Sequence, residues 1–504
     1  MDNTANSADL GVVDPEGGAP NENRFSLSSL NSRKILRKSP PARVLRAVVL
    51  GSLAFAGGLV GSIVTTHGAN ATPLNENPYA ATLQLGRVLV QVENNYVDPV
   101  ERTRLVNGAI SGMVEQLDPH SAYMPPPDYT AFQDDTEGKF EGVGIEVDLR
   151  GDAIIVLAPI QGTPAERAGI RSGDRILGID GEQVLSSSLD AMVKRMRGKP
   201  GSHIKLTVRR EGVRELLSFD LVREVIHVPS VTSRLLDGNI AYVRIKQFQE
   251  RTHEELLRAA GELRARAQPS PNGNGNGNGK KSGEVLAGVI LDMRSNPGGL
   301  VDEAAGVADE FLSSGGIYTT RHRGEIIDDV RARRGGAFSD VPIVILVNEW
   351  SASASELVAG ALQDNRRAMV VGGNTFGKGS VQSIIDLPGG AGLRLTTARY
   401  YTPGGHSIQA EGIHPDVLLT TKPTDPNALK AVHERDLEGH LATETSRNAP
   451  TPGGTTRAVP EGGTLEPIDV RELQSNPTKS NDFALRTGYE LLRDKLAGKG
   501  PIVH

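Results

Sequence analysis

The stretch VPIVILVNEWSASASELVAGAL, residues 341–362, leads from an apolar run through alternating serine and alanine into a helical pattern. Unbroken Val, Ile and Leu runs are typical of strands buried on both faces of an α/β sheet. Reactive groups in such sheets collect at the carboxyl ends of the strands, where helix N-termini offer free backbone N–H groups. Ser351, Ser353 and Ser355 are therefore all candidates for a nucleophile held on a strand-to-helix turn, and their position alone does not choose among them.

The same alternation of strands and helices extends over residues 225–420, which we interpret as one α/β domain. The predicted strands include VLAGVILDM, RAMVVGG, VQSIIDL and LRLTTARYY, and helices are predicted at 301–313 and 355–364. Residues 268–283, QPSPNGNGNGNGKKSG, cannot bury apolar surface and are expected to form a flexible surface insertion. Residues 421–504 are predicted to be a linker rich in Pro, Thr and Gly that ends in one amphipathic helix, FALRTGYELLRDKL.

Two smaller regions precede this domain. In the region 73–136, apolar residues recur at helical spacing from Tyr79 to Leu117, and NNYVDPV breaks the pattern into two amphipathic helices. Residues 137–224 contain short β runs separated by Gly and Asp turns, with one helical segment at 189–197, and form a compact β-rich module. The two helices are too short to bury their apolar stripes alone, so we expect them to pack on another domain or on a second copy of the chain.

The N-terminus carries a candidate membrane anchor. An uncharged run of 18 residues, Ala47–Val64, would be about 27 Å long as a helix, close to the hydrocarbon thickness of a bilayer. Six Lys and Arg residues precede it between positions 33 and 46, which orients residues 1–46 as a disordered cytoplasmic tail and places the remainder outside. We predict a transmembrane signal anchor at 47–65. Cleavage after Ala71, within the small-x-small sequence Ala-Asn-Ala, would instead release a secreted protein.

Composition excludes several classes of function. The chain has 504 residues, too many for a single core, and a formal net charge of −6, which gives no reason to expect a nucleic-acid partner. It has no cysteine, so a disulfide, a thiol nucleophile and a cysteine-ligated zinc site are all excluded.

Two further junctions could complete an active site. In LDMRSNPGGL (291–300) a buried strand enters a turn whose glycines let backbone N–H groups face a ligand, as an oxyanion hole requires, although a plain tight turn is an equal alternative. In RAMVVGGNTFGKGSVQ (367–382), Lys378 becomes a useful base if burial or a nearby cation lowers its pKa. The same stretch contains the G-x-x-x-x-G-K part of a P-loop, but Gly379 stands where Ser or Thr should hold magnesium, and a strand follows where a helix is needed.

A Ser-His-Asp arrangement has no support in the pattern, because no histidine adjoins a Gly-x-Ser-x-Gly elbow. His406 and His414, in the loops YYTPGGHSIQ and GIHPD, are interpreted as surface or turn residues.

Seven segments in order resemble the motifs of the carboxyl-terminal processing peptidases, also called tail-specific proteases: LDPHSAYMPP, FEGVGIEV, PIQGTPAERAGIRSGDRILGIDG, LDMRSNPGG, SASASE, TFGKGSVQ and YYTPGGHSIQAEGIHPDV. The resemblance covers roughly residues 78–420. It implies a multidomain α+β protein with an α/β protease core of the crotonase-like type, an inserted PDZ domain at 137–224 and an N-terminal helical region. It also implies a serine/lysine dyad without metal or organic cofactor.

Carried over by motif, the resemblance makes Ser353 the nucleophile, Lys378 the general base and Gln382 the residue that orients the lysine. The family's oxyanion-hole donors correspond to the backbone N–H of Ala354 and the backbone of Gly298 or Gly299. Asp364 matches a supporting position in some members. In the PDZ module, Gly142, Val143, Gly144 and Ile145 resemble the loop that binds a peptide's C-terminal carboxylate. Trp350 departs from the family pattern, in which a small residue is common there.

The expected function is a serine endopeptidase that captures protein C-termini through its PDZ domain and hydrolyses peptide bonds near that end through an acyl-enzyme. The expected location is the periplasmic side of a bacterial inner membrane. The expected partners are protein substrates with free C-termini, an adaptor or activator, and a second copy of the chain, for which the N-terminal helices and the terminal helix are candidate contacts. The rival hypothesis is an inactive PDZ scaffold that only binds C-terminal peptides.

Overall fold

The computed structural model describes residues 79–150, 153–184, 189–267, 286–420, 431–444, 455–460 and 462–499. The chain divides into two compact units, one ending at Asn94 and the other beginning at Asn95. The predicted tail, the predicted span at 47–65 and the Asn/Gly insertion at 268–283 lie outside the described residues. Within the described ranges, no helix combines the length and apolar character needed to cross a bilayer.

The first unit contributes helix α2 (Ala80–Asn95), one of the two helices expected before the β-rich module. None of its residues is buried, and Leu83 and Val88 are 61% and 54% exposed. Its contact with another domain or a second copy therefore stays a prediction.

The second unit opens with the other expected helix, α3 (Arg102–Val114), followed by strand β1 (Ala122–Met124) and helix α4 (Pro126–Thr136). The sequence pattern missed α4 because its residues, PPDYTAFQDDT, lack a clear apolar stripe. Its two prolines occupy the first turn, where a missing N–H costs nothing and the fixed φ favours a helix start.

The α/β domain is built on a sheet of seven strands in the order β10-β11-β12-β15-β16-β19-β20. Only the β10–β11 pair is antiparallel. Its strands are β10 (Val231–Leu236), β11 (Ile240–Ile245), β12 (Gly288–Asp292), β15 (Ile343–Val347), β16 (Ala368–Gly372), β19 (Val417–Thr420) and β20 (Thr455–Ala458). Every residue of β12, β15 and β16 is buried, which confirms the expectation drawn from the unbroken apolar runs.

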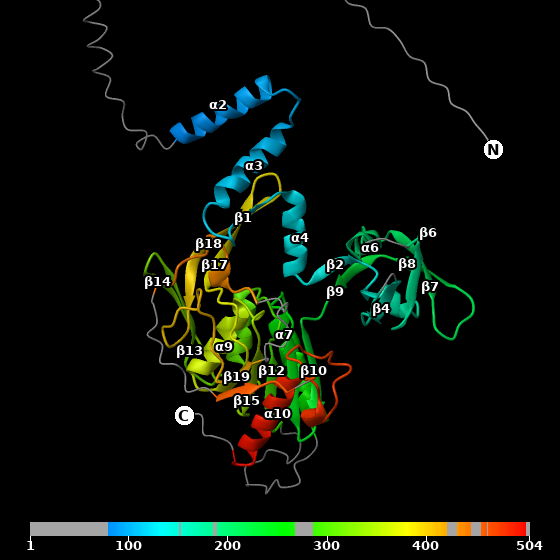
Figure 1. The fold of residues 1–504 in the computed structure, drawn as a ribbon, viewed down its shortest axis with the longest axis vertical. Coiled ribbons are helices and arrows are strands. Elements are labelled where there is room, and N and C mark those ends of the chain that lie inside the picture. The colour runs from blue at the N-terminus through cyan, green and yellow to red at the C-terminus, as the bar shows by residue number, and fades with distance from the viewer. Residues whose placement is uncertain are drawn as a thin grey trace, which may run out of the picture. The chain divides into compact units, whose positions relative to one another are not determined.

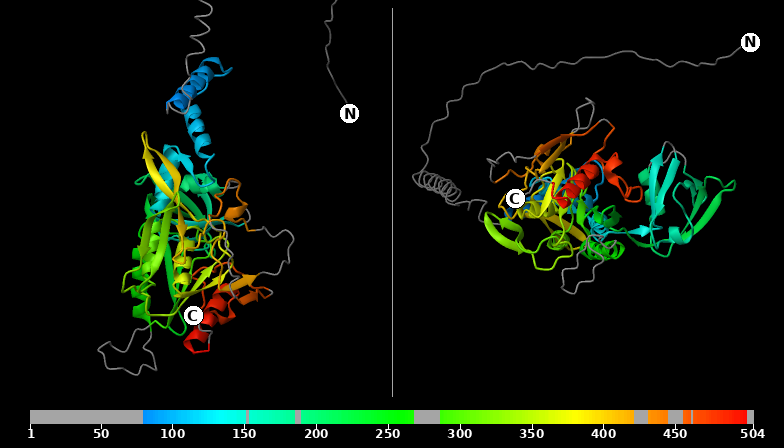
Figure 2. Two further views of the ribbon diagram at one scale, coloured as in Figure 1. Left: turned by 90° about the vertical axis from the view of Figure 1, so that its left-hand side faces the viewer. Right: turned by 90° about the horizontal axis from the view of Figure 1, so that it is seen from below.

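Helices cover both faces of this sheet (Figures 1 and 2). On one face, α7 (Thr252–Arg266), α8 (Val301–Asp309) and α9 (Ala354–Asp364) bury a single apolar cluster against the strands. On the other face, α10 (Phe483–Leu496) packs through a second cluster that includes Leu485, Tyr489 and Leu492.

The C-terminal region is therefore part of the core, although the sequence predicted a linker there. Strand β20 extends the seven-stranded sheet next to β19, and the short helices η1 (Glu434–Asp436) and η2 (Pro477–Lys479) lie on either side of β20 in the chain. The apolar stripe of the terminal helix is already buried on the sheet of its own chain, so only its exposed face is left for the predicted dimer contact, which stays a prediction.

A buried ion cluster ties α10 to the end of β12. Asp482, the N-cap of α10, accepts two hydrogen bonds from the Arg294 guanidinium at 2.7 and 2.8 Å, and Arg294 also pairs with Asp292. Tyr242 donates to Asp292 at 2.8 Å. All four side chains are essentially inaccessible to solvent. Through its bonds to Arg294, Asp482 joins the C-terminal helix to the start of the Pro-Gly-Gly turn. Removing one partner would leave an uncompensated buried charge, which is strongly destabilising.

A second, antiparallel sheet stands beside the first and has the order β1-β18-β13-β14, with β17 also paired to β18. Its other strands are β13 (Gly316–His322), β14 (Glu325–Arg331), β17 (Ser380–Leu387) and β18 (Ala391–Tyr401). Strands β17 and β18 were both predicted from the sequence. Their antiparallel pairing places Gln382 opposite Thr396.

The β-rich module at 137–224 forms its own sheet in the order β3-β4-β5-β7-β8, with β6 on β5, around a separate apolar cluster. Its elements are β3 (Ile145–Arg150), β4 (Ala153–Pro159), α5 (Pro164–Arg167), β5 (Arg175–Ile179), β6 (Glu182–Gln183), α6 (Leu189–Met196), β7 (His203–Arg209) and β8 (Leu217–Val222). The chain enters through β2 (Lys139–Gly142) and leaves through β9 (Glu224–His227), which pair with each other (Figure 1).

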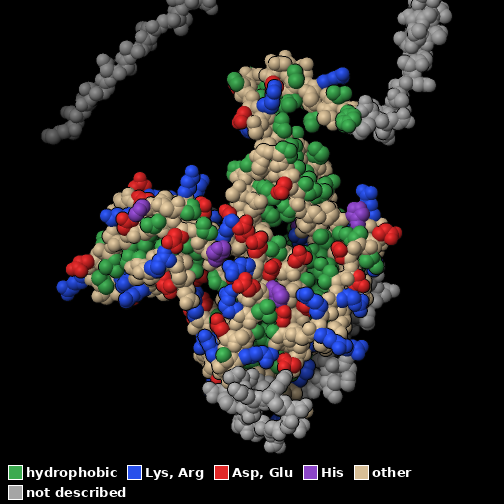
Figure 3. All heavy atoms as spheres, turned by 180° about the vertical axis from the view of Figure 1, so that it is seen from behind, with side chains coloured by type: hydrophobic (Ala, Val, Ile, Leu, Met, Phe, Trp, Pro, Cys, Tyr) green, Lys and Arg blue, Asp and Glu red, His purple; other side chains and the backbone are tan. Residues whose placement is uncertain are grey.

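On the face of the molecule shown in Figure 3, acidic and basic side chains are interspersed over the core. This face offers no continuous basic surface to a polyanion, in keeping with the net charge of −6.

Candidate active site

The structure separates the three serines that the sequence left equal. Ser351 donates its hydroxyl to the carbonyl of Met293 at 2.8 Å, and Ser355 donates to the carbonyl of Asn296 at 2.9 Å. Both side chains are fully buried, and both brace the strand-end turn of β12 against that of β15. Ser353 alone of the three lines a cavity, of about 220 Å³, and it is 8% exposed, whereas Ser351 and Ser355 are 0% exposed.

Ser353 is held in an unusual backbone conformation. It is the N-cap of α9 and has a φ of 55°, a region that non-glycine residues seldom adopt. Such a strained turn between a strand and a helix persists only where its surroundings fix it, and it is a recurring feature of catalytic positions.

Lys378 lines the same cavity as Ser353. Burial, and next the nearby guanidinium of Arg394, lower the pKa of Lys378 to about 8, while Glu434, Asp118 and Glu356 oppose the shift. A lysine in this range is partly unprotonated near neutral pH and can accept a proton. The cavity thus supplies the desolvation that the sequence argument required for a base.

Glu356 connects the serine to the lysine, and the sequence reasoning missed it. One carboxylate oxygen accepts the backbone N–H groups of Ser353 and Lys378 at 2.7 and 2.9 Å, and the other accepts the N–H of Gly377 and the hydroxyl of Thr375. Burial raises the pKa of this fully buried carboxyl to about 7. The spacing Ser353-x-x-Glu356 is that of a helix capping box and could have revealed the residue from the sequence.

Gln382 also lines the cavity, but its amide contacts its own strand. Its Nε2 donates to Ser380 Oγ at 2.8 Å and reaches Thr396 Oγ1 at 3.4 Å. Lys378 precedes β17, and a register shift lies between Val381 and Gln382. The regular alternation of side chains along a strand therefore does not decide whether residues 378 and 382 lie on the same face. The two side chains nevertheless reach one cavity.

The predicted oxyanion-hole residues lie around Ser353. Ala354 is the first residue of α9, and no described residue accepts a hydrogen bond from its N–H. A Cβ built on Gly298 would come within 2.8 Å of Ser353 Cβ and 2.9 Å of the Ala354 nitrogen, so glycine is needed for the close approach. The Gly298 N–H, however, donates to Asn296 Oδ1 at 2.9 Å. Gly299 lines the cavity, and no described residue accepts from its N–H, which makes it the better second donor.

Asp364 and Trp350 lie apart from this cavity. Asp364 is the last residue of α9, roughly 15 Å along the helix from Ser353, and it accepts the N–H of Gly404 at 2.8 Å. Its contact holds the loop after β18 and does not reach the serine or the lysine. Trp350 is half-exposed on the strand-end turn and does not line the cavity.

The two alternative site chemistries are not formed. Among the described residues that line the cavity there is no histidine, so a Ser-His pair is not assembled there. The GGNTFGK segment is followed by strand β17 and not by a helix, so the phosphate-binding helix N-terminus of a P-loop is missing from this described segment. In the described part of the chain, no group of acidic or histidine side chains is arranged to hold a metal ion.

The predicted carboxylate-binding loop joins β2 to β3 in the β-rich module. Gly144 has a φ of 78°, and a Cβ there would come within 2.5 Å of three Thr163 atoms, so only glycine fits. Strand β3, which begins at Ile145, is an edge strand that, among the described strands, pairs only with β4. A free edge beside a loop of backbone N–H groups is the geometry on which a peptide adds as a further strand.

Comparison with known proteins places these regions in one family. Residues 239–419 match the model of peptidase family S41, residues 155–210 match a PDZ domain, and residues 72–126 match the N-terminal domain of the activating protease CtpB.

Full-length relatives extend the match. The chain is 38% identical over 445 residues to a carboxy-terminal-processing protease of Bartonella bacilliformis, covering 87% of this chain and 94% of the relative. It is 36% identical over 351 residues to a probable CtpA-like serine protease of Staphylococcus aureus, covering 69% and 66% of the two chains. Among solved structures, a photosystem II D1 C-terminal processing protease matches with 29% identity and a TM-score of 0.40, covering 67% of this chain and 92% of that one. The chain therefore belongs to the carboxy-terminal-processing proteases of peptidase family S41, which are serine-type peptidases, and it carries a PDZ domain.

Proposed function

We propose that this peptidase works through a Ser353–Lys378 dyad and an acyl-enzyme. The observation that carries the proposal is that both side chains line one small cavity, in which burial lowers the pKa of the lysine to about 8. The hydroxyls of Ser351 and Ser355 are both committed to backbone carbonyls. Ser353 is thus the member of the trio that a substrate can reach.

The proposed reaction has two halves. Neutral Lys378 accepts the hydroxyl proton of Ser353 as Oγ bonds to the substrate carbonyl carbon, and the resulting ammonium returns that proton to the leaving amine as the C–N bond breaks. The N–H groups of Ala354 and Gly299 stabilise the negative charge on the carbonyl oxygen. Lys378 then takes a proton from water, the hydroxide adds to the ester, and Ser353 leaves with its proton restored.

The dyad is tested with the chain lacking residues 1–72 and an unstructured protein substrate with an apolar tail. Ser353→Ala and Lys378→Ala should each abolish cleavage. Ser351→Ala and Ser355→Ala should still cleave the substrate, because each retains Ser353. Circular dichroism and denaturant unfolding show whether each variant is folded. Full activity in a folded Ser353→Ala variant would contradict the assignment of Ser353 as the nucleophile.

We also propose that the PDZ domain captures the substrate's C-terminus at the Gly142–Ile145 loop and the free edge of β3. The proposal is supported by the edge position of β3 and by the left-handed conformation of Gly144. Replacing the substrate's terminal carboxylate by an amide should weaken binding and cleavage about tenfold or more, because the charge-assisted hydrogen bonds are lost. Equal binding of the acid and the amide would show that the loop does not read the carboxylate.

Finally, we propose that residues 47–65 anchor the chain in the inner membrane of a bacterial envelope, with the peptidase and PDZ domains in the periplasm. The support is the sequence itself: an uncharged run of 18 residues preceded by six Lys and Arg residues. Cleavage after Ala71 would give the secreted alternative.

A further inference from the structure

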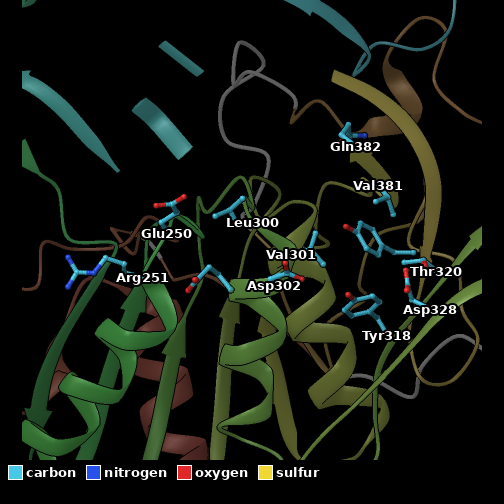
Figure 4. Close-up of a pocket in the computed structure, with 12 residues that line it drawn as sticks. Glu250, Arg251, Leu300, Val301, Asp302, Tyr318, Thr320, Asp328, Val381 and Gln382 are labelled. Carbon is cyan, nitrogen blue, oxygen red and sulfur yellow. Dashed lines mark hydrogen bonds between the residues drawn. The ribbon is translucent and has the colours of Figure 1, made fainter. Parts of the chain in front are cut away.

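A second, larger cavity adjoins the one that Ser353 and Lys378 line, and Figure 4 shows the residues around the larger cavity. Its volume is about 670 Å³, and the two cavities share Leu300, Val301, Gln382 and Tyr400 as common walls. A polypeptide whose scissile bond lies at Ser353 can therefore place a neighbouring side chain in the larger cavity without leaving the active site.

The larger cavity is lined by more negative than positive charge. Glu250, Asp302, Glu303 and Asp328 contribute four carboxyl groups from three separate parts of the core. None of the four forms an ion pair with a described Lys, Arg or His. Among the described residues that line the cavity, the one cation is Arg251, which pairs with Glu254 on the exposed start of α7. Figure 4 shows Arg251 at the opposite end of the cavity from Asp328.

The dipole of α8 accounts for only part of this charge. Asp302 and Glu303 lie in the first turn of that helix, where carboxylates are favoured. Asp328 comes from β14 in the second sheet and accepts a hydrogen bond from Thr320 at 2.7 Å. Figure 4 shows Asp328, Thr320 and Tyr318 together at the end of the cavity that lies beyond Val301 and Asp302.

Two buried tyrosines supply an independent sign of a ligand at that end. Tyr400 and Tyr318 are only 2% and 8% exposed, and both line the cavity. No described residue forms a hydrogen bond with either hydroxyl. Neither oxygen is among the enclosed side-chain atoms that lack a partner, so both hydroxyls are open to the cavity and can bond to a group bound there. Burial, and then charges that include Asp302 and Asp328, raise the pKa of Tyr318 to about 12 and also raise the pKa of Tyr400, so both stay protonated.

We propose that this cavity is a substrate subsite that takes a lysine or arginine side chain close to the scissile bond. Leu300, Val301 and the two tyrosine rings offer apolar walls to the aliphatic stem, and Asp302 and Asp328 offer charge to its cationic end. The tyrosine oxygens accept hydrogen bonds from the ammonium or guanidinium group. The inference rests on the proposed function, because it assumes that the substrate is cleaved at Ser353.

The test uses the full chain and a set of unstructured peptides with free C-termini. Lysine, norleucine or glutamate is placed in turn at each of the three residues on either side of the cleaved bond, which mass spectrometry identifies. At one position, kcat/KM should be about tenfold or more higher for lysine than for norleucine, and lowest for glutamate. The preference should weaken at high salt, because part of the attraction is accessible to screening ions.

Asp302→Asn and Asp328→Asn keep the side-chain shape and remove the charge. Each should reduce the lysine-to-norleucine ratio severalfold, and the double variant should bring it close to one. Asp329→Asn is the matched control, since Asp329 is the next residue on β14, does not line the cavity and pairs with exposed Arg331. The control should retain the full ratio.

The outcomes separate this proposal from the dyad. Cleavage that depends on Ser353 but shows the same ratio in the double variant and in the wild type would overturn the subsite and leave the dyad standing. If no peptide is cleaved, fluorescence anisotropy of the same labelled peptides on Ser353→Ala measures the subsite by itself. Tighter lysine binding that is lost in the Asp302→Asn, Asp328→Asn background supports it, and equal binding of lysine and norleucine peptides overturns it.

Discussion

At the scale of single residues, the proposed active site depends on which serine hydroxyl and which lysine amine can reach the cavity. The hydroxyls of Ser351 and Ser355 donate hydrogen bonds to backbone carbonyls and thereby join two strand-end turns, whereas Ser353 lines the cavity. Lys378 reaches the same cavity from the loop before β17, next to the cationic side chain of Arg394. A serine and a lysine with no histidine between them can work only if the amine is neutral when the substrate is bound.

The lowered pKa of Lys378 predicts the pH dependence of the reaction. If Lys378 is the base, as proposed, it must be unprotonated, so kcat/KM should rise with pH through a midpoint at about 8 and fall about tenfold per pH unit well below it. Arg394→Gln removes a cation that disfavours the ammonium, and should therefore move the midpoint to higher pH by up to about one unit.

The control for this prediction is Arg399→Gln, on the same strand, whose guanidinium pairs with Glu444 and is not among the charges that shift Lys378. It should leave the midpoint in place. A pH profile that is flat from pH 6 to 9, or a midpoint that moves to lower pH in Arg394→Gln, would contradict the role of Lys378 as the base.

Some residue-level features could be read from the sequence and others could not. The Ser353 and Lys378 assignments came from motif resemblance, because position alone left three serines equal. What separates them physically is the pair of hydrogen bonds that Ser351 and Ser355 make to residues about 58 positions earlier in the chain. Contacts of that sequence separation have no local pattern. The hydrogen bond from the Gly298 N–H to Asn296 Oδ1 likewise depends on the geometry of the turn and could not be read from the sequence.

At the scale of elements, helix α9 and the loop that carries Lys378 are joined through one carboxylate. Glu356, in the first turn of α9, accepts hydrogen bonds from the N–H groups of Ser353, Gly377 and Lys378 and from the hydroxyl of Thr375. The proposed nucleophile and the proposed base lie on different elements, and this carboxylate fixes the backbone of both.

Glu356→Gln should therefore impair catalysis and stability together. In glutamine, an NH₂ group that can only donate replaces one of the two acceptor oxygens. Two of the four groups that donate to Glu356 would then face another donor and stay unpaired in a fully buried place. We expect the free energy of unfolding to fall by about 1–3 kcal/mol, and kcat to fall by roughly 100-fold as the two reacting groups shift. Denaturant unfolding and steady-state kinetics measure the two effects.

Exposed Glu438 provides the control, since Glu438→Gln should alter neither quantity by more than the usual effect of a surface change, about 0.5 kcal/mol. A Glu356→Gln enzyme with wild-type kcat would show that the carboxylate does not position the dyad.

The elements that the sequence predicted correctly are those with a strong period or an unbroken apolar run. Strands β12, β15 and β16 are fully buried, and α10 coincides with FALRTGYELLRDKL. The elements that it missed lack such a signal. Helix α4 begins with two prolines and has no apolar stripe, and β20 is a four-residue edge strand, TTRA, with no buried residue. Its place is set by pairing with β19, and not by its own residues.

At the scale of the whole molecule, the order of the regions was predictable, but the extent of the core was not. The β-rich module and the α/β domain were separable in the sequence because their apolar periods differ. The C-terminal residues read as a linker, yet β20 and α10 complete the core, and Asp482 joins the buried Arg294–Asp292 pair across nearly 190 residues of chain. An ion cluster of this kind is invisible until the fold brings its members together.

The proposed topology makes a further prediction for the intact chain in a bacterial cell. The full chain should sediment with membranes and resist extraction at alkaline pH, and the peptidase domain should be degraded by protease added to spheroplasts. A chain lacking residues 1–72 and fused to a cleavable secretion signal is the control, and it should be released as a soluble protein. Extraction of the full chain by alkali would contradict an anchor and favour the secreted form.

The most direct measurement of the central claim is to map the covalent intermediate. The chain is mixed with a slowly deacylating ester substrate, quenched in acid during turnover, digested and analysed by mass spectrometry. We predict one acyl group per chain, attached to Ser353, and no such adduct in Ser353→Ala or in Lys378→Ala at neutral pH. An acyl group on Ser351 or Ser355, or an adduct that forms at the wild-type rate in Lys378→Ala, would contradict the proposed dyad.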